Sequence, residues 1–170
     1  MKRLWLAVAV VVLTAFSVNA QRFAYVDTEY ILEKIPEYQQ AQKDLDAIAA
    51  QWKQEIEDKY AEIDRLYKKF QAEQYLMDEQ TKRRKEEEII QKEKEVKEYQ
   101  KQKFGYEGEL FEKRQELVKP IQDRVYNAIK DLAESRNYDF IFDKSSAGSS
   151  MLFASPRYDK SEDILKELGY

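Results

Sequence analysis

Apolar residues recur at a regular spacing between Pro36 and about Phe70. Successive positions are three or four residues apart, which is the spacing of one face of an α-helix with coiled-coil character. Three consecutive steps of four near Trp52–Tyr60 disturb the pattern, as a stutter does. The positions are Tyr38, Ala41, Leu45, Ile48, Trp52, Ile56, Tyr60, Ile63, Tyr67 and Phe70.

A second helical stretch follows, and its apolar stripe is thin from Lys82 to Lys103. Asp78 suits a helix N-cap, so we expect the chain to reverse at Leu76–Glu79. In an antiparallel hairpin with this centre, residue i lies opposite residue 156 − i. The apolar positions of the second stretch are Ile89, Val96, Tyr99, Leu110, Leu117, Ile121, Val125, Ala128 and Leu132.

Two glycines and a proline interrupt the second helical stretch. Gly105 and Gly108 are poor helix formers, and they fall opposite Trp52 in the predicted register. We predict a hinge formed by Trp52, Gly105 and Gly108; the alternative is that Gly105 only makes room for the Trp52 ring. Pro120, which falls opposite Pro36, should kink the helix or start a new segment.

Short aromatic runs on both sides of the hairpin predict strands at Phe23–Val26, Tyr138–Phe142 and Met151–Ala154. Asp27 should cap a short helix at Thr28–Lys34, and Asn137 suits a left-handed helix end. Asp159–Glu162 has a pattern similar to a capping box and should start a last helix that ends at Gly169. The predicted fold is mainly α with a small β base (α+β): a hairpin arm over residues 36–136, and an association domain from residues 21–35 and 137–170.

Three short strands leave exposed sheet edges and aromatic side chains on both faces. Self-association would cover them, so we expect a cyclic homo-oligomer in which several subunits form one sheet or barrel. The alternative is a monomer whose last helix covers the sheet. The predicted oligomerisation residues are Phe23, Tyr25, Val26, Phe140, Ile141, Phe142, Leu152 and Phe153.

Residues 1–20 have the features of a secretory signal peptide. Lys2 and Arg3 precede an apolar run, and Ser17–Ala20 supplies small residues for cleavage after Ala20. The alternative is an uncleaved N-terminal anchor. We therefore expect a periplasmic protein, and the lack of cysteine means that an exported domain would be held by packing or association rather than by disulfides.

Composition argues against several function classes. The chain has no histidine and no glycine-rich phosphate-binding motif, and no pair stands out among its 33 acidic residues, so we predict no enzyme, cofactor or metal site. Without residues 1–20 there are 27 basic and 33 acidic residues, which argues against nucleic-acid binding. Only Lys82–Lys103 is net basic, with nine basic and six acidic residues.

The order of these elements, with Phe23–Asp27, Ile31–Leu32 and Pro36–Tyr38 at the front, resembles the Skp/OmpH family of periplasmic chaperones. Phe104–Gly108, Arg114–Leu117 and Pro120–Asp123 look like the form found in Bacteroidetes-type bacteria. The resemblance implies a homotrimer with a small barrel and three helical arms. Its cavity would hold unfolded outer-membrane proteins without ATP, with the outer-membrane assembly machinery as a further partner. The well-known members are strongly basic, so the acidic charge of this chain, with a pI near 5.2, leaves lipid contact open.

Side chains at the expected tip of the arm are the candidates for client contact. Further candidates along the arm are Tyr60, Tyr67 and Phe70, which could instead form the contact surface between the two helices. The basic residues at 82–85 could instead be a solvated helix face. A coiled-coil tether or adaptor of the cell envelope is the main alternative function; a prefoldin-like chaperone and a carboxylate-based hydrolase are weaker ones. The tip candidates are Tyr75, Leu76, Met77, Lys82, Arg83, Arg84 and Lys85.

Overall fold

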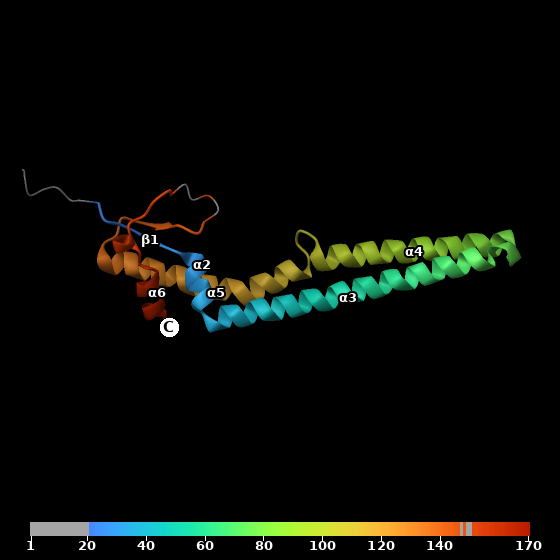
Figure 1. Ribbon diagram of the computed structural model, residues 1–170, viewed down its shortest axis with the longest axis horizontal. Helices are drawn as coiled ribbons and strands as arrows, with labels where there is room; N and C mark the ends of the chain where they lie inside the picture. Colours follow the sequence, from blue (N-terminus) through green and yellow to red (C-terminus); the bar gives the residue numbers. More distant parts are fainter. Residues whose placement is uncertain (1–20, 147, 149–150) are drawn as a thin grey trace, which may run out of the picture. The chain divides into compact units, whose positions relative to one another are not determined.

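A computed structural model describes residues 21–146, 148 and 151–170, so the expected signal peptide lies outside the described residues. The chain divides into two compact units (Figure 1). The sheet unit contains the residues up to Ile31 together with Val125–Tyr170, and the hairpin unit contains Leu32–Arg124. The fold is mainly helical with one small sheet, as predicted.

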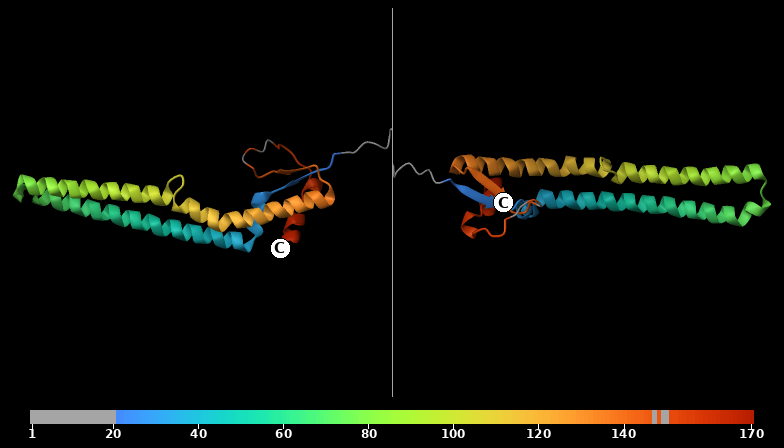
Figure 2. Two further views of the ribbon diagram at one scale, coloured as in Figure 1. Left: turned by 180° about the vertical axis from the view of Figure 1, so that it is seen from behind. Right: turned by 90° about the horizontal axis from the view of Figure 1, so that it is seen from above.

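Two long helices dominate the hairpin unit. Helix α3 (Pro36–Glu73) begins with Pro36 at its first position, where a missing N–H is not needed. Its 38 residues span about 57 Å. A 3-10 turn, η1 (Gln74–Leu76), reverses the chain into α4 (Glu79–Phe104). The two helices lie side by side (Figure 1 and Figure 2). As predicted, Asp78 caps α4, because its side chain accepts a hydrogen bond from the Thr81 N–H at 2.8 Å.

A narrow row of apolar side chains joins α3 to α4. We call it the seam, and it consists of Ile56, Ile63 and Phe70 from α3 with Ile89 and Val96 from α4. Residues within each helix are seven apart, which is a coiled-coil repeat. The interpretation of Phe70 as a contact between the two helices is therefore confirmed. The same interpretation is wrong for Tyr60 and Tyr67, because both are exposed. Leu66 packs against the seam where the stripe included Tyr67.

Helix α5 (Glu109–Arg136) follows a four-residue interruption at Gly105–Gly108 and runs through both units. Pro120 does not start a new segment, because α5 continues through it; the alternative, that Pro120 kinks the helix, stays a prediction. Asn137 has φ 52°, in the left-handed region, and the Tyr138 N–H bonds to the Ala133 carbonyl at 2.9 Å. This bond closes the helix end. The predicted strand began at Tyr138, but β2 begins only at Phe140, so the prediction is wrong for Tyr138.

The sheet unit contains a two-stranded parallel sheet. Strand β1 (Phe23–Val26) pairs with β2 (Phe140–Asp143), with Phe23 opposite Phe140 and Val26 opposite Asp143. The third predicted strand is absent from the described residues, since Met151–Ala154 has no regular secondary structure. Asp159 and Lys160 lie beside β1 instead: the Lys160 N–H donates to the Tyr25 carbonyl at 2.9 Å.

Three short helices complete the described part of the sheet unit. Helix α2 (Thr28–Lys34), which continues into the hairpin unit, has the predicted bounds, and the Asp27 side chain caps it by accepting from the Tyr30 N–H at 2.9 Å. A 3-10 turn, η2 (Pro156–Tyr158), precedes α6 (Ser161–Leu168), which ends at Gly169 with φ 89°. The buried residues of the sheet unit are Ala24, Tyr25, Val26, Ile31, Val125, Ala128, Leu132, Ser161, Ile164 and Leu165.

Candidate functional site

The tip of the hairpin unit exposes two large side chains. Tyr75 is 86% exposed and Leu76 is 90% exposed, because both lie in the 3-10 turn beyond the last seam residue. Met77 differs from them, since its side chain packs back against the seam. Two of the three apolar tip candidates therefore offer free apolar surface, and the third, Met77, helps to close the end of the seam.

The predicted basic residues lie in the first two turns of α4. Lys82 pairs with Glu79 at 2.9 Å, and Lys85 pairs with Glu88 at 2.8 Å. Arg84 reaches the Thr81 hydroxyl at 3.4 Å, and Arg83 is exposed. Ion pairs between residues one turn apart in the same helix are typical of a solvated helix face. For Lys82 and Lys85 this geometry favours a solvated face over client contact.

Polar contacts cross between α3 and α4 where the apolar stripe is thin. Lys92 pairs with Glu62 at 2.9 Å, and the Tyr99 hydroxyl donates to the Glu55 carboxylate. This hydrogen bond, together with burial, raises the pKa of Tyr99 to about 12. A small cavity of about 220 Å³ beside them is lined by Lys59, Glu62, Ile63, Lys92, Glu95, Val96 and Tyr99. Polar pairs thus supply part of the cohesion that apolar burial supplies elsewhere.

The predicted hinge residues come together in the hairpin unit. The rings of Trp52 and Phe104 meet edge to face, with centroids 6.1 Å apart, so Trp52 lies where the register of the hairpin predicts it. Gly105 and Gly108 bound the interruption between α4 and α5. That these residues move remains a prediction.

Exposed aromatic and aliphatic side chains gather in the sheet unit. Phe23, Phe140 and Phe142 are each about half exposed, and Leu152 and Phe153 are almost fully exposed. Ile141 is half-buried, whereas Tyr25 and Val26 are buried within the chain, so these two contribute to folding rather than to free surface. A cavity of about 460 Å³ is lined by Phe23, Ala24, Tyr25, Phe142, Met151, Phe153, Ala154, Ser155, Arg157 and Tyr158.

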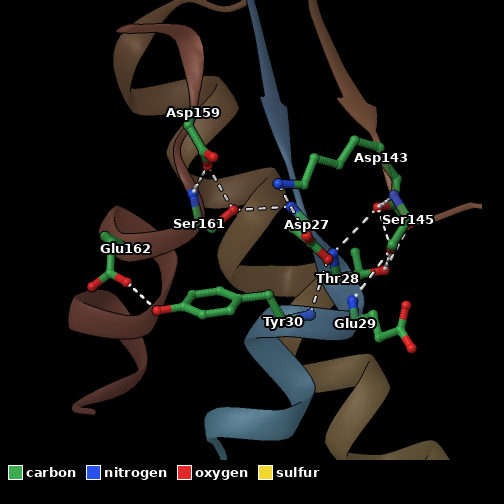
Figure 3. A network of polar contacts seen from close by, with 10 residues as sticks. Asp27, Thr28, Glu29, Tyr30, Asp143, Ser145, Asp159, Ser161 and Glu162 are labelled. Atoms are coloured by element: carbon green, nitrogen blue, oxygen red, sulfur yellow. Dashed lines mark hydrogen bonds and ion pairs between the residues drawn. The ribbon is translucent and has the colours of Figure 1, made fainter. Parts of the chain in front are cut away.

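A polar network fixes the C-terminal end of β1 from both sides (Figure 3). On one side Asp143 accepts hydrogen bonds from the Thr28 hydroxyl at 2.7 Å and from the Ser145 hydroxyl at 2.7 Å. On the other side Ser161 donates its hydroxyl to Asp159 at 2.7 Å and accepts the Asp27 N–H at 2.9 Å.

The two sides of this network share a short sequence motif that was not among the predicted sites. Asp-Lys-Ser occurs at residues 143–145 and again at 159–161, and each serine N–H and hydroxyl bonds to the aspartate two residues before it. The repetition of this motif was the only sequence signal from which the network could have been predicted. The predicted capping box at the start of α6 does not form in this way, because Glu162 accepts a hydrogen bond from the Tyr30 hydroxyl instead.

Burial alone would raise the pKa of Asp143 and of Asp159, but hydrogen bonds outweigh it in both cases. Those from Thr28 and Ser145 hold the pKa of Asp143 below its ordinary value. Those from Ser161 do the same for Asp159, helped by the nearby charge of Lys144. Both carboxylates are therefore ionised acceptors at neutral pH.

Two other features are absent from the described residues. They contain no group of three or more His, Cys, Asp or Glu side chains that could hold a metal ion. Among the same residues, no helix is both long enough and apolar enough to cross a membrane.

Comparisons with known proteins agree with this architecture. A crystal structure described as a candidate outer membrane chaperone (OmpH-like) from Caulobacter crescentus CB15 superposes with a TM-score of 0.69 at 11% identity, covering 87% of this chain and 83% of that one. At this identity the likeness shows the fold. No curated protein matches the chain.

A family profile extends the comparison to the sequence itself. The profile for outer membrane proteins of the OmpH-like type matches residues 22–168, which is nearly all of the described chain. The match does not distinguish the Bacteroidetes-type form, which stays a prediction. The chain belongs to the OmpH-like family of outer membrane proteins.

Proposed function

We propose that this protein is a periplasmic holdase chaperone that binds unfolded outer-membrane proteins without ATP and prevents their aggregation. The observation that carries the proposal is the exposed apolar surface at the hairpin tip, formed by Tyr75 and Leu76. Aromatic and aliphatic side chains of this kind offer adaptable contact with many sequences. The OmpH-like relative from Caulobacter, itself described as a candidate chaperone, supports the same role.

The mechanism needs only many weak contacts. A protein that binds the unfolded state lowers the concentration of free unfolded chain, and aggregation slows by mass action. Several hairpins acting on one client would raise the apparent affinity far above that of a single tip. No nucleotide is required, because release can follow from folding of the client into a state that the tips do not bind.

The proposal includes a homotrimer assembled through the sheet unit. In the single chain four large apolar side chains of this unit are in contact with water, namely Phe140, Phe142, Leu152 and Phe153. Contiguous apolar surfaces that monomeric soluble proteins would leave in water are commonly covered by another protein. Analytical ultracentrifugation should give three chains per particle, and Phe140→Asp with Leu152→Asp should give smaller particles; a monomeric unaltered chain would contradict this part of the proposal.

An aggregation assay tests the chaperone function. A β-barrel outer-membrane protein is diluted out of urea without ATP, and light scattering is followed with and without stoichiometric trimer. We expect suppression, and we expect Tyr75→Ser with Leu76→Ser to weaken client binding at least tenfold, since each side chain loses apolar contact. Tyr106→Ser is the matched control, because Tyr106 is 94% exposed but lies outside the tip.

The outcomes separate the chaperone from the tether or adaptor. If the unaltered trimer fails to suppress aggregation, the holdase proposal is wrong. If it suppresses aggregation but the tip variant and the Tyr106 control behave alike, the tip is not the client-binding surface. Binding of one folded envelope protein, with no effect on unfolded clients, would favour the tether.

A further inference from the structure

The interruption between α4 and α5 is a closed loop of four residues. The Gly105 N–H donates to the Lys101 carbonyl at 2.7 Å, which completes α4. The Gly108 N–H donates to the Gly105 carbonyl at 3.0 Å, so the two ends of the loop meet. Figures 1 and 2 show the loop standing out from the side of the helical path, and Tyr106 within it is 94% exposed.

Both glycines are required by the closed shape of this loop. A Cβ atom on Gly108 would lie 2.7 Å from the Gln102 carbonyl oxygen and 2.9 Å from the Gly105 nitrogen. A Cβ atom on Gly105 would collide with the Lys101 carbonyl oxygen. These are backbone atoms of the last turn of α4 and cannot rotate away, so alanine at either position is incompatible with the closed loop.

Pairing across the hairpin shows that the loop is left out of the register. In an antiparallel pair of continuous helices, the residue numbers of facing partners add up to a constant. On the tip side of the loop the total is 154 for Glu62 with Lys92 and for Glu55 with Tyr99, and 156 for Trp52 with Phe104. Beyond the loop it rises to 161 for Glu37 with Arg124. The total rises by five to seven, and four of these correspond to the residues that the loop removes from the helical path.

Four residues are also close to one helical turn of 3.6 residues. Lys103 and Ile121 are 18 residues apart with the loop included and 14 apart without it. Both spacings return to nearly the same helix face, so the buried stripe of α5 suits either arrangement. The loop could therefore join the helix without moving the apolar stripe away from α3, which is itself uninterrupted.

Side-chain contacts hold the loop closed. Lys103 at the end of α4 pairs with Glu109 at the start of α5 at 2.5 Å, and the Gln102 amide donates to Glu109 at 2.9 Å. The Lys103 ammonium also lies 4.7 Å from the centroid of the Trp52 ring. A contact of this kind between a cation and an aromatic ring is attractive. The two contacts to Glu109 bridge the loop, and they require the end of α4 to lie beside the start of α5, as it does while the loop is extruded.

We propose that Gly105–Gly108 is a stored helical turn, and that the hairpin has two registers. In the closed register the loop is extruded and Lys103 contacts Glu109. In the extended register the four residues join a continuous α4–α5 helix, and residues on either side of them move apart by about 6 Å along the helix axis. One-turn shifts of packed helices are a known form of conformational switch. The proposal stands independently of the chaperone function.

A distance measurement between two spin labels tests the proposal. The chain has no cysteine, so Glu87→Cys in α4 and Arg114→Cys in α5 give two unique labelling sites. Labelled chains are diluted with unlabelled chains, and the intrachain distance is measured by electron–electron double resonance. Adding Gly105→Ala and Gly108→Ala should give a peak about 6 Å longer, because alanine cannot enter the closed loop and favours the helix.

Two further variants keep the test decisive if the double alanine variant is unstable. Tyr106→Ala is the matched control: it raises helix propensity in the same loop without a backbone clash, and should leave the main distance unchanged. Deletion of residues 105–108 should fold and keep the short distance of the unaltered chain. The proposal is overturned if the folded double alanine variant keeps the short distance, or if the deletion variant loses its hairpin by circular dichroism and hydrogen exchange.

Discussion

The two units of this protein use charged side chains in different ways. In the sheet unit, Asp143 and Asp159 accept hydrogen bonds from backbone and hydroxyl groups. One donor to Asp143 is Thr28, which is 115 residues away in the sequence. In the hairpin unit, the ion pairs within α3 and α4, such as Lys68 with Asp64, join exposed neighbours one turn apart. A helix fixes its own backbone, so its surface charges are free to vary. Loops that must meet around a strand need polar groups that fix their geometry.

The largest predicted effect is the loss of a core side chain from the sheet unit. Ile164 in α6 is fully buried, so Ile164→Ala should leave a cavity and cost about 4 kcal/mol of unfolding free energy. Urea unfolding at fixed chain concentration measures this, with hydrogen exchange of the sheet-unit amides as the local probe. Ile90→Ala is the control, since Ile90 is mostly exposed, and should change the free energy by less than about 0.5 kcal/mol. Equal effects of the two substitutions would contradict the assignment of the core.

The two units also differ in how far the sequence predicts them. Helix ends were readable because their signals are local: Asp78 caps a group three residues away, and Asn137 ends α5 through its own backbone angle. The network at β1 was not readable, because Asp27 and Ser161 are 134 residues apart. No local sequence pattern predicts a contact between residues so far apart. The repeated Asp-Lys-Ser motif is visible in the sequence, but it does not show which segment it contacts.

Errors in the hairpin have a different physical origin. Tyr67 and Leu66 are adjacent, and either continues an apolar stripe with steps of three or four residues. Only packing against α4 decides between them, and it selects Leu66. The strand predicted at Met151–Ala154 fails for a related reason, since a strand exists only with a partner and the edge of β1 is occupied by Asp159 and Lys160. The tip residues followed from the position of the turn, yet their exposure could not be deduced from it.

The second effect tests the polar network itself. Asp143→Asn keeps the size of the side chain but replaces one acceptor oxygen with an NH₂ group, which can only donate. The groups that face it are themselves donors: the Thr28 hydroxyl and the N–H groups of Thr28 and Ser145. We expect a loss of about 2 kcal/mol, the typical value for hydrogen bonds to a charged acceptor. Urea unfolding measures it. Asp44→Asn is the matched control on an exposed part of α3, where Asp44 accepts from Gln40. A control as costly as Asp143→Asn would mean that burial and geometry do not matter here.

A smaller effect is expected from the polar contact between α3 and α4. Tyr99→Phe removes the hydrogen bond to Glu55 and should cost about 1 kcal/mol. Because the folded pKa of Tyr99 is raised to about 12 from an ordinary value of 10, its contribution is complete below pH 10 and is lost as the pH rises through 12. The chain has 12 tyrosines, so the tyrosinate absorbance of the variant must be subtracted from that of the unaltered chain. A difference spectrum that appears near pH 10 would show that Tyr99 is not held in this way.

The smallest effect is predicted for an exposed ion pair in the hairpin. Lys68 and Asp64 are 2.7 Å apart, but their side chains are 71% and 56% exposed, so water and salt screen the attraction. Lys68→Ala should therefore change the unfolding free energy by at most about 0.5 kcal/mol, and the good helix propensity of alanine offsets part of the loss. Urea unfolding at low and high salt measures both contributions. A cost above about 1 kcal/mol that disappears in salt would mean that the hairpin depends on its surface charges as much as the sheet unit depends on Asp143, and the contrast between the two units would fail.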